Sequence, residues 1–360
     1  MNINVEGSAY EQGKAYGAVA KDLIAKNIEV VKYIVTDQKK MDLDYYRTFV
    51  KQNADFIERD RPDTAEEMHG LADGSGIPYE DILLMNVQLF LHADLLTSDC
   101  SVVVAHGPAT LDGKTYMGKN RDISYPMDHV VMRRKYNSGV VVSEVNPAGA
   151  VVWPGSGINS AGLSVATSGV VSPVVKQDLR PAAYSHVTVN PNYVLQACET
   201  VDDVIKFIKY ETSHVFHVNF VAADEKRCVC IELTKNDMEI VESLDGMLIR
   251  SNHYHHPAML RYNPTRQEYL STYNRYRRAM SYLWGKHGEI RFQDILRILS
   301  DHEGGGDGAL CRHGLPRKDG TTDGYTAYGS IAVSQDRQLW TALGNPCQSL
   351  IYSGLHGSCE

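Results

Sequence analysis

The chain has 360 residues, of which 43% are hydrophobic and 22% charged, and its formal net charge is −8. This is the composition of a globular protein with a sizeable core. The acidic balance and the thinly spread Lys and Arg exclude a nucleic-acid binder. No stretch approaches the roughly 20 apolar residues that span a bilayer, and the first residues lack the basic and apolar parts of a secretory signal.

The cysteines are odd in number and scattered, which favours reduced thiols over a disulfide framework. They are Cys100, Cys198, Cys228, Cys230, Cys311, Cys347 and Cys359. We therefore expect a cytoplasmic protein with neither a nucleic-acid nor a membrane partner.

The first hundred residues predict helices. Apolar residues recur at helical spacing from Tyr10 to Ile34, and Ser8 with Glu11 forms a capping-box pattern before them. A second helix fits Leu43 to Ile57, and two shorter helical pieces, interrupted by glycines, follow Pro62.

The pattern changes at Cys100, where short β-branched segments separated by turn residues begin. Strands are expected from there to Gly169, followed by one helix over Tyr193–Tyr210. Later strands are expected at Val215–Ala222, Arg227–Thr234, Glu239–Leu244, Met247–Arg250, Ser330–Ser334 and Leu339–Leu343, with helices at Thr272–Trp284 and Arg291–Ser300. Adjacent strands interrupted by pairs of helices predict an α+β fold of antiparallel sheets covered by helices, in one compact domain.

Cys100 is the candidate nucleophile. A cysteine that opens an apolar strand is usually a core residue. Cys100, however, follows an exposed-looking turn at 96–99, which would leave an open approach in front of a rigid strand.

Eight segments spread over nearly the whole chain carry a family resemblance. They are GSAYEQG (7–13), EMHGLADGSGIP (67–78), DILLMN (81–86), CS (100–101), GKNRD (118–122), GINSAGL (157–163), SNH (251–253) and LCR (310–312). In this order and spacing they resemble the isopenicillin N acyltransferase family, a branch of the N-terminal-nucleophile hydrolases. The resemblance implies a four-layer αββα sandwich with a helical N-terminal segment.

The resemblance also implies self-cleavage between Asp99 and Cys100. The products would be a helical subunit (1–99) and a catalytic subunit (100–360) that stay associated. A free thiol needs a nearby base, and the new α-amine of Cys100, with a reference pKa of about 7.7–8.0, can supply it. The enzyme would cleave a small N-acyl amide or peptide-like substrate through a Cys100 thioester, or transfer its acyl group.

The resemblance implies roles for two further residues. Asp122 would orient the α-amine, and Asn252 would donate to the oxyanion, as a preset amide can. The alternatives are a solvated carboxylate at a strand end for Asp122 and an ordinary turn residue for Asn252.

Several positions support the site or depart from the family pattern. Lys119 stands where the bile-salt hydrolase branch has an arginine, whose forked geometry an ammonium cannot reproduce. Asp99 stands where the isopenicillin enzyme has glycine, and Thr322-Asp323 where it has a serine–arginine pair. The supporting or substrate-binding candidates are Lys119, Asn120, Thr167, Ser168 and Thr234.

No metal or other cofactor is expected, and acyl-coenzyme A would be only a substrate of a transferase. His253, His255 and His256 lack a second cluster with ligand spacing, and Cys228 and Cys230 fit core thiols. The glycine-rich segment 303–308 fits a flexible loop. A homo-oligomer is left open.

Two rival interpretations remain. One is a Cys–His protease with an intact chain, although Cys100 lacks the local signature of that class. The other is a non-catalytic binding protein on the same fold.

Overall fold

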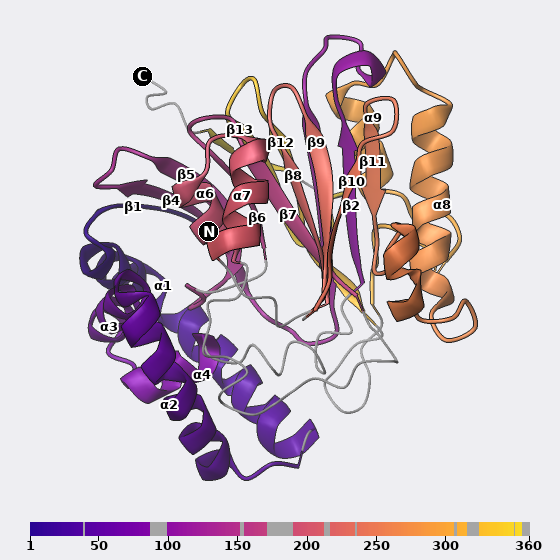
Figure 1. Cartoon of the computed structure of the whole chain (residues 1–360). Coiled ribbons are helices and arrows are strands. Elements are labelled where there is room, and N and C mark those ends of the chain that lie inside the picture. The colour runs from indigo at the N-terminus through magenta and orange to yellow at the C-terminus, as the bar shows by residue number, and fades with distance from the viewer. Residues whose placement is uncertain are drawn as a thin grey trace.

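The computed structural model describes residues 1–38, 40–86, 99–151, 155–170, 190–211, 217–234, 236–305, 308–314, 324–348 and 350–354 (Figure 1). None of the helices in these ranges has both the length and the apolar character needed to cross a membrane.

Two stacked sheets form the centre of the described structure. In spatial order, the larger sheet contains β1 (Asn2–Gly7), β4 (His129–Tyr136), β5 (Val141–Pro147), β6 (Ser156–Asn159), β7 (Ser164–Gly169), β8 (Val218–Ala223), β9 (Cys228–Leu233) and β10 (Met238–Glu242). The smaller sheet contains β11 (Met247–Arg250), β2 (Cys100–Ala105), β3 (Tyr116–Ile123), β12 (Tyr325–Val333), β13 (Gln338–Leu343) and β14 (Ile351–Gly354). Neighbouring strands are antiparallel except β1 and β4, which are parallel.

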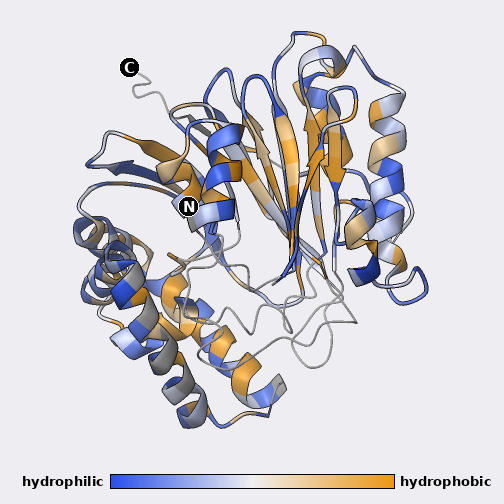
Figure 2. Cartoon of the chain, viewed as in Figure 1, coloured by the Kyte–Doolittle hydropathy of each residue, from blue (hydrophilic) through white to orange (hydrophobic). Residues whose placement is uncertain are grey.

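Helices cover the outer face of each sheet. The larger sheet carries α6 (Pro191–Ala197) and α7 (Val201–Glu211), and the smaller carries α8 (Leu270–Trp284) and α9 (Phe292–Leu299) (Figure 1). Side chains alternate between the two faces of β2 and so contribute to two separate hydrophobic cores. Val102 and Val104 pack between the sheets, whereas Val103 packs under α8 and α9. Figure 2 shows apolar residues concentrated on the strands. The expected four-layer αββα sandwich is confirmed.

The N-terminal helices pack beside this sandwich. They are α1 (Ala9–Tyr33), α2 (Leu43–Asp60), α3 (Pro62–Ser75) and α4 (Tyr79–Asn86), with a π-helical turn at Ile34–Gln38. The capping box of Ser8 and Glu11 is present as expected. A Cβ added to Gly70 would lie 2.1 Å from the Tyr10 carbonyl oxygen, so α1 and α3 meet backbone to backbone.

The sequence predicts a purely helical N-terminal segment, but the structure also contains a strand there. Asn2–Gly7 forms β1, the edge strand of the larger sheet, and its alternate residues Ile3 and Val5 are buried. The helix expected over Tyr193–Tyr210 is in fact two helices, because the chain turns to an extended conformation at Cys198.

A buried ion-pair cluster ties α3 to the larger sheet. Arg134 on β4 donates to Glu144 of β5 at 2.7 Å and also pairs with Glu67 of α3. All three side chains are buried, so each charge depends on its partners. This cluster and β1 join residues on the two sides of the expected cleavage point.

Candidate active site

Cys100 is the first residue of β2, a strand flanked by β3 and β11 within the smaller sheet. It pairs with Arg121, and by alternation its side chain shares the inter-sheet face of Val102. Cys100 is 0% exposed and Asp99 is 6% exposed. The open approach expected in front of Cys100 is therefore wrong, because both residues are buried, and the rest of the expected turn, 96–98, lies outside the described residues.

Two cations act on the Cys100 thiol. Arg121 Nη1 lies 3.9 Å from Sγ, and Lys119, two residues earlier on β3, is fully buried beside it. Burial by itself would raise the pKa of the Cys100 thiol, but Lys119 and Arg121 together outweigh burial and lower that pKa. The Lys119 ammonium also donates to the Thr167 carbonyl. The site therefore favours the thiolate, and Arg121 is a contributor that the sequence analysis missed.

Asn252, just after β11, contacts the backbone of Cys100. Its Oδ1 accepts the Cys100 N–H at 3.0 Å, and its Nδ2 donates to the Gly169 carbonyl at 2.7 Å. Its own N–H donates to the Thr272 hydroxyl at 2.7 Å. The amide oxygen therefore faces the backbone nitrogen of Cys100, and the oxyanion role of Nδ2 stays a prediction.

Asp99 is buried because its carboxylate is paired. It contacts Arg275 at 2.8 Å, the Ser271 hydroxyl at 3.1 Å, and also Arg312 and Tyr269. Burial would raise the pKa of Asp99, yet the two guanidinium groups outweigh burial and lower it.

Arg275 spans the Asp99–Cys100 bond. Besides Asp99, it donates to the Cys100 carbonyl oxygen at 2.5 Å. Sequence reasoning did not single out Arg275, and Arg312 entered only as part of a motif. A signal for Arg275 existed: it lies on the buried stripe of α8 with Ser271, Ala279 and Leu283, where an arginine needs partners.

Asp122 lies at the end of β3, next to the same bond. Its backbone N–H donates to the Asp99 carbonyl oxygen at 2.9 Å. Its Oδ1 accepts from the Thr326 hydroxyl at 2.7 Å, and Arg312 Nε lies 3.8 Å from Oδ2. Burial raises the pKa of the Asp122 carboxyl to about 6. Within the described residues, Oδ2 accepts no hydrogen bond. The solvated carboxylate considered from the sequence is thus wrong.

The remaining candidates have structural contacts. Asn120 faces the helical layer, where its Nδ2 donates to the carbonyls of Leu299 and Leu310 at 2.8 Å each. Ser168 donates to the Ser251 carbonyl, and the Thr234 hydroxyl accepts the backbone N–H of Asp237 at 2.9 Å in a turn. A direct catalytic contact of Asn120 or Thr234 is therefore not supported, and Thr322-Asp323 lies outside the described residues.

The histidines at 253–256 and the two cysteines of the C-x-C sequence, Cys228 and Cys230, are packing residues of the fold. His253 Nδ1 contacts the hydroxyls of Ser251 and Thr272 at 3.1 and 2.9 Å. Among the described residues, the histidines at 253–256 do not form a group of metal ligands. Cys228 and Cys230 are buried between the sheets, as expected for core thiols.

Comparison with known families defines the class of protein. One family model, described as an acyl-transferase, matches residues 110–348, about two thirds of the chain. The chain belongs to the acyl-coenzyme A:6-aminopenicillanic acid acyl-transferase family. The match begins after Cys100, so the candidate nucleophile lies outside it. The search of curated proteins found no match.

Solved structures show more distant likeness. A mutant of the conjugated bile acid hydrolase from Clostridium perfringens is 12% identical with a TM-score of 0.49, covering 71% of this chain and 92% of that one. Penicillin V acylase from Agrobacterium tumefaciens is 15% identical with a TM-score of 0.44, covering 71% of this chain and 86% of that one.

Proposed function

We propose that the protein is a self-cleaving amide hydrolase or acyltransferase whose nucleophile is Cys100. The observation that supports this most is the arrangement around one peptide bond. The Asp99 carbonyl oxygen accepts the Asp122 N–H at 2.9 Å, and the adjacent thiol has a lowered pKa.

These contacts suit cleavage of the Asp99–Cys100 bond. The Cys100 thiolate attacks the Asp99 carbonyl carbon, and the Asp122 N–H stabilises the oxyanion that forms. Collapse of this intermediate breaks the C–N bond, the nitrogen takes a proton to become the α-amine, and a thioester remains. Water then hydrolyses the thioester, which leaves a new C-terminal α-carboxylate on Asp99 and a free thiol on Cys100.

Turnover would use the same thiol with the new amine as its base. The amine takes the thiol proton, and the thiolate attacks the carbonyl of a small N-acyl amide or peptide-like substrate. Asn252 Oδ1, which accepts the Cys100 N–H at 3.0 Å, would hold the amine, and the buried Asp122 Oδ2, which accepts no hydrogen bond among the described residues, would be a second acceptor. The protonated α-amine returns its proton to the substrate nitrogen as the C–N bond breaks, the substrate amine leaves, and water or an acceptor amine then resolves the acyl-enzyme.

The rival Cys–His protease has less support. Burial, with Arg250 and Arg275 nearby, lowers the pKa of His253 to about 3, which does not suit a histidine that must carry a proton. A non-catalytic binding protein would not explain the ion pairs of Asp99, the lowered pKa of the Cys100 thiol or the hydrogen bond between Asn252 and Cys100.

The intact mass of freshly purified protein tests the proposal. We expect fragments of roughly 11 and 29 kDa by residue count, absent from Cys100→Ala. Cys198→Ala is the matched control, because it removes another buried free cysteine, at the end of α6, and should still cleave. A single species of 40.1 kDa in wild type after long incubation would contradict the self-cleavage proposal.

A further inference from the structure

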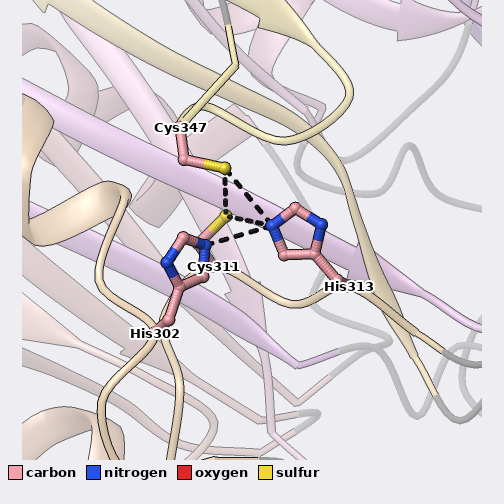
Figure 3. Close-up of side chains that lie close together, drawn as sticks. All are labelled: His302, Cys311, His313 and Cys347. Carbon is pink, nitrogen blue, oxygen red and sulfur yellow. Dashed lines mark hydrogen bonds between the residues drawn. The ribbon is translucent and has the colours of Figure 1, made fainter.

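Four side chains with metal-binding atoms meet outside the candidate active site. They are His302, Cys311, His313 and Cys347 (Figure 3). Their ligand atoms all lie within 4.8 Å of one another. His302 follows α9, Cys311 and His313 precede β12, and Cys347 follows β13, so the chain brings them together from three connections. Cys311 is buried and the other three are exposed, which gives an ion a path from solvent.

Four of the six separations between the ligand atoms are close to those of a tetrahedral metal site. The two sulfurs are 3.8 Å apart, and the two Nε2 atoms are 3.0 Å apart. His313 Nε2 lies 3.3 Å from the Cys347 sulfur and 3.8 Å from the Cys311 sulfur. Zinc–ligand bonds of about 2.3 Å to sulfur and 2.0–2.1 Å to nitrogen place two sulfurs about 3.8 Å apart, two nitrogens about 3.3 Å, and mixed pairs about 3.6 Å.

A neighbouring amide contacts one of the two sulfurs. Asn345 Nδ2 lies 3.4 Å from the Cys311 sulfur, as a donor to a ligating thiolate would, and also donates to the Arg312 carbonyl at 2.5 Å. The cysteines are not bonded to each other, since their 3.8 Å separation far exceeds a disulfide bond of about 2.05 Å.

We propose that His302, Cys311, His313 and Cys347 bind one Zn²⁺ ion in a closed, four-ligand structural site. Two thiols and two neutral imidazoles bind the ion, and the two thiol protons are released to solvent, which leaves a neutral complex. Two thiolates with two imidazoles suit zinc, whereas the hard cations Mg²⁺ and Ca²⁺ prefer oxygen ligands. This departs from the expectation of no metal, which considered the histidines at 253–256 and the pair Cys228 and Cys230.

The ion would position Arg312. This residue lies between the ligands Cys311 and His313, and its guanidinium reaches Asp99 and Asp122. Its backbone N–H is held by the Thr326 hydroxyl at 2.9 Å. A metal on both flanking residues fixes the short segment that carries this guanidinium, while remaining outside the reaction itself.

Zinc binding by the full-length protein is the direct test. Metal content is measured by mass spectrometry after dialysis against Zn²⁺, and uptake of Co²⁺ is followed by the absorption of tetrahedral thiolate-bound cobalt. We expect one ion per chain in wild type and in Cys100→Ala, so the result does not depend on self-cleavage. Cys311→Ser and His302→Ala should lose the ion, and Asn345→Ala should weaken Zn²⁺ affinity about 10- to 100-fold.

The control variant is His287→Ala, which removes another exposed histidine and should keep the ion. Circular dichroism shows whether each variant is folded, and Asn345→Ala keeps all four ligands should Cys311→Ser unfold. Absence of Zn²⁺ uptake by wild type, unchanged uptake in folded ligand variants, or a Cys311–Cys347 disulfide in the freshly purified protein would each overturn the proposal.

Discussion

Arg275 and Asn252 meet at the backbone nitrogen of the candidate nucleophile: Arg275 Nη2 donates to Asn252 Oδ1 at 2.7 Å. The same oxygen accepts the Cys100 N–H at 3.0 Å. Both donors require an oxygen at this position, so the pair fixes the orientation of the Asn252 amide. Arg275 thereby connects the Asn252 side chain with Asp99, on the other side of the bond proposed to break.

Replacing Arg275 with lysine should slow cleavage. Lysine keeps the charge but cannot donate at once to Asp99, Asn252 and the Cys100 carbonyl. Loss of one such charge-assisted bond, about 1.5–3 kcal/mol, corresponds to a rate about 10- to 100-fold lower. The measurement is the time course of fragment formation after cell-free synthesis. Arg278→Lys, on the same helix but paired near the surface with Asp301, should cleave at the wild-type rate.

The pKa of Asp122 predicts the pH dependence of processing. Burial raises this pKa to about 6, so the folded chain carries the carboxylate only above that pH. We expect the cleavage rate of newly synthesised precursor to rise through pH 6 and then level off, because only the carboxylate form of Asp122 can accept a hydrogen bond from the nitrogen that becomes the α-amine as the C–N bond breaks. Asp122→Asn should cleave slowly at every pH. An unchanged profile in that variant would assign the titration to another group.

Titration of the Asp122 carboxyl should change the free energy of unfolding in the opposite direction to the cleavage rate. The folded chain holds the Asp122 proton more tightly than the unfolded chain, so its contribution to stability decreases as pH rises from 3.8 to about 6. Urea unfolding of Cys100→Ala, with and without Asp122→Asn, isolates this contribution. The difference between the two proteins should change across that interval and stay constant above it.

Removing Glu67 should weaken the attachment of the helical segment. Glu67→Ala takes one of its two carboxylate partners from the buried Arg134, leaves Glu144 in place, and should cost about 1.5–3 kcal/mol. The free energy of unfolding is measured in the Cys100→Ala background. Glu66→Ala, one residue earlier and exposed, should change it by less than about 0.5 kcal/mol. Equal losses in both variants would mean that the buried pair contributes little.

The contact between α1 and α3 should not tolerate a methyl group. A Cβ at position 70 would lie 2.1 Å from the Tyr10 carbonyl oxygen, and neither helix backbone can move without disturbing the packing. We expect Gly70→Ala to lower the free energy of unfolding by at least about 1–3 kcal/mol. Gly285→Ala is the control, because its Cβ would lie 3.5 Å from the nearest atom in an ordinary helical conformation. Thermal unfolding of both variants provides the comparison.

Local patterns in the sequence predicted much of the fold. The capping box at Ser8, the alternation from Cys100 onward and the amphipathic helices are set by neighbours a few residues apart, and the structure contains them. The alternation of Ile3 and Val5 is an equally local signal for β1, although the helical pattern that follows it dominates the first hundred residues. The motifs that indicated the family are likewise contiguous.

The sequence by itself determined the αββα architecture, the family and a cysteine at the start of a strand. Only the tertiary structure decided the burial of Asp99, the position of Arg275 across the candidate bond, and the convergence of His302 with Cys347. Helical and strand periodicities are local and can be read along the chain. These contacts join residues tens to hundreds of positions apart, and they exist only because two sheets stack and helix α8 packs its buried face against the end of β2.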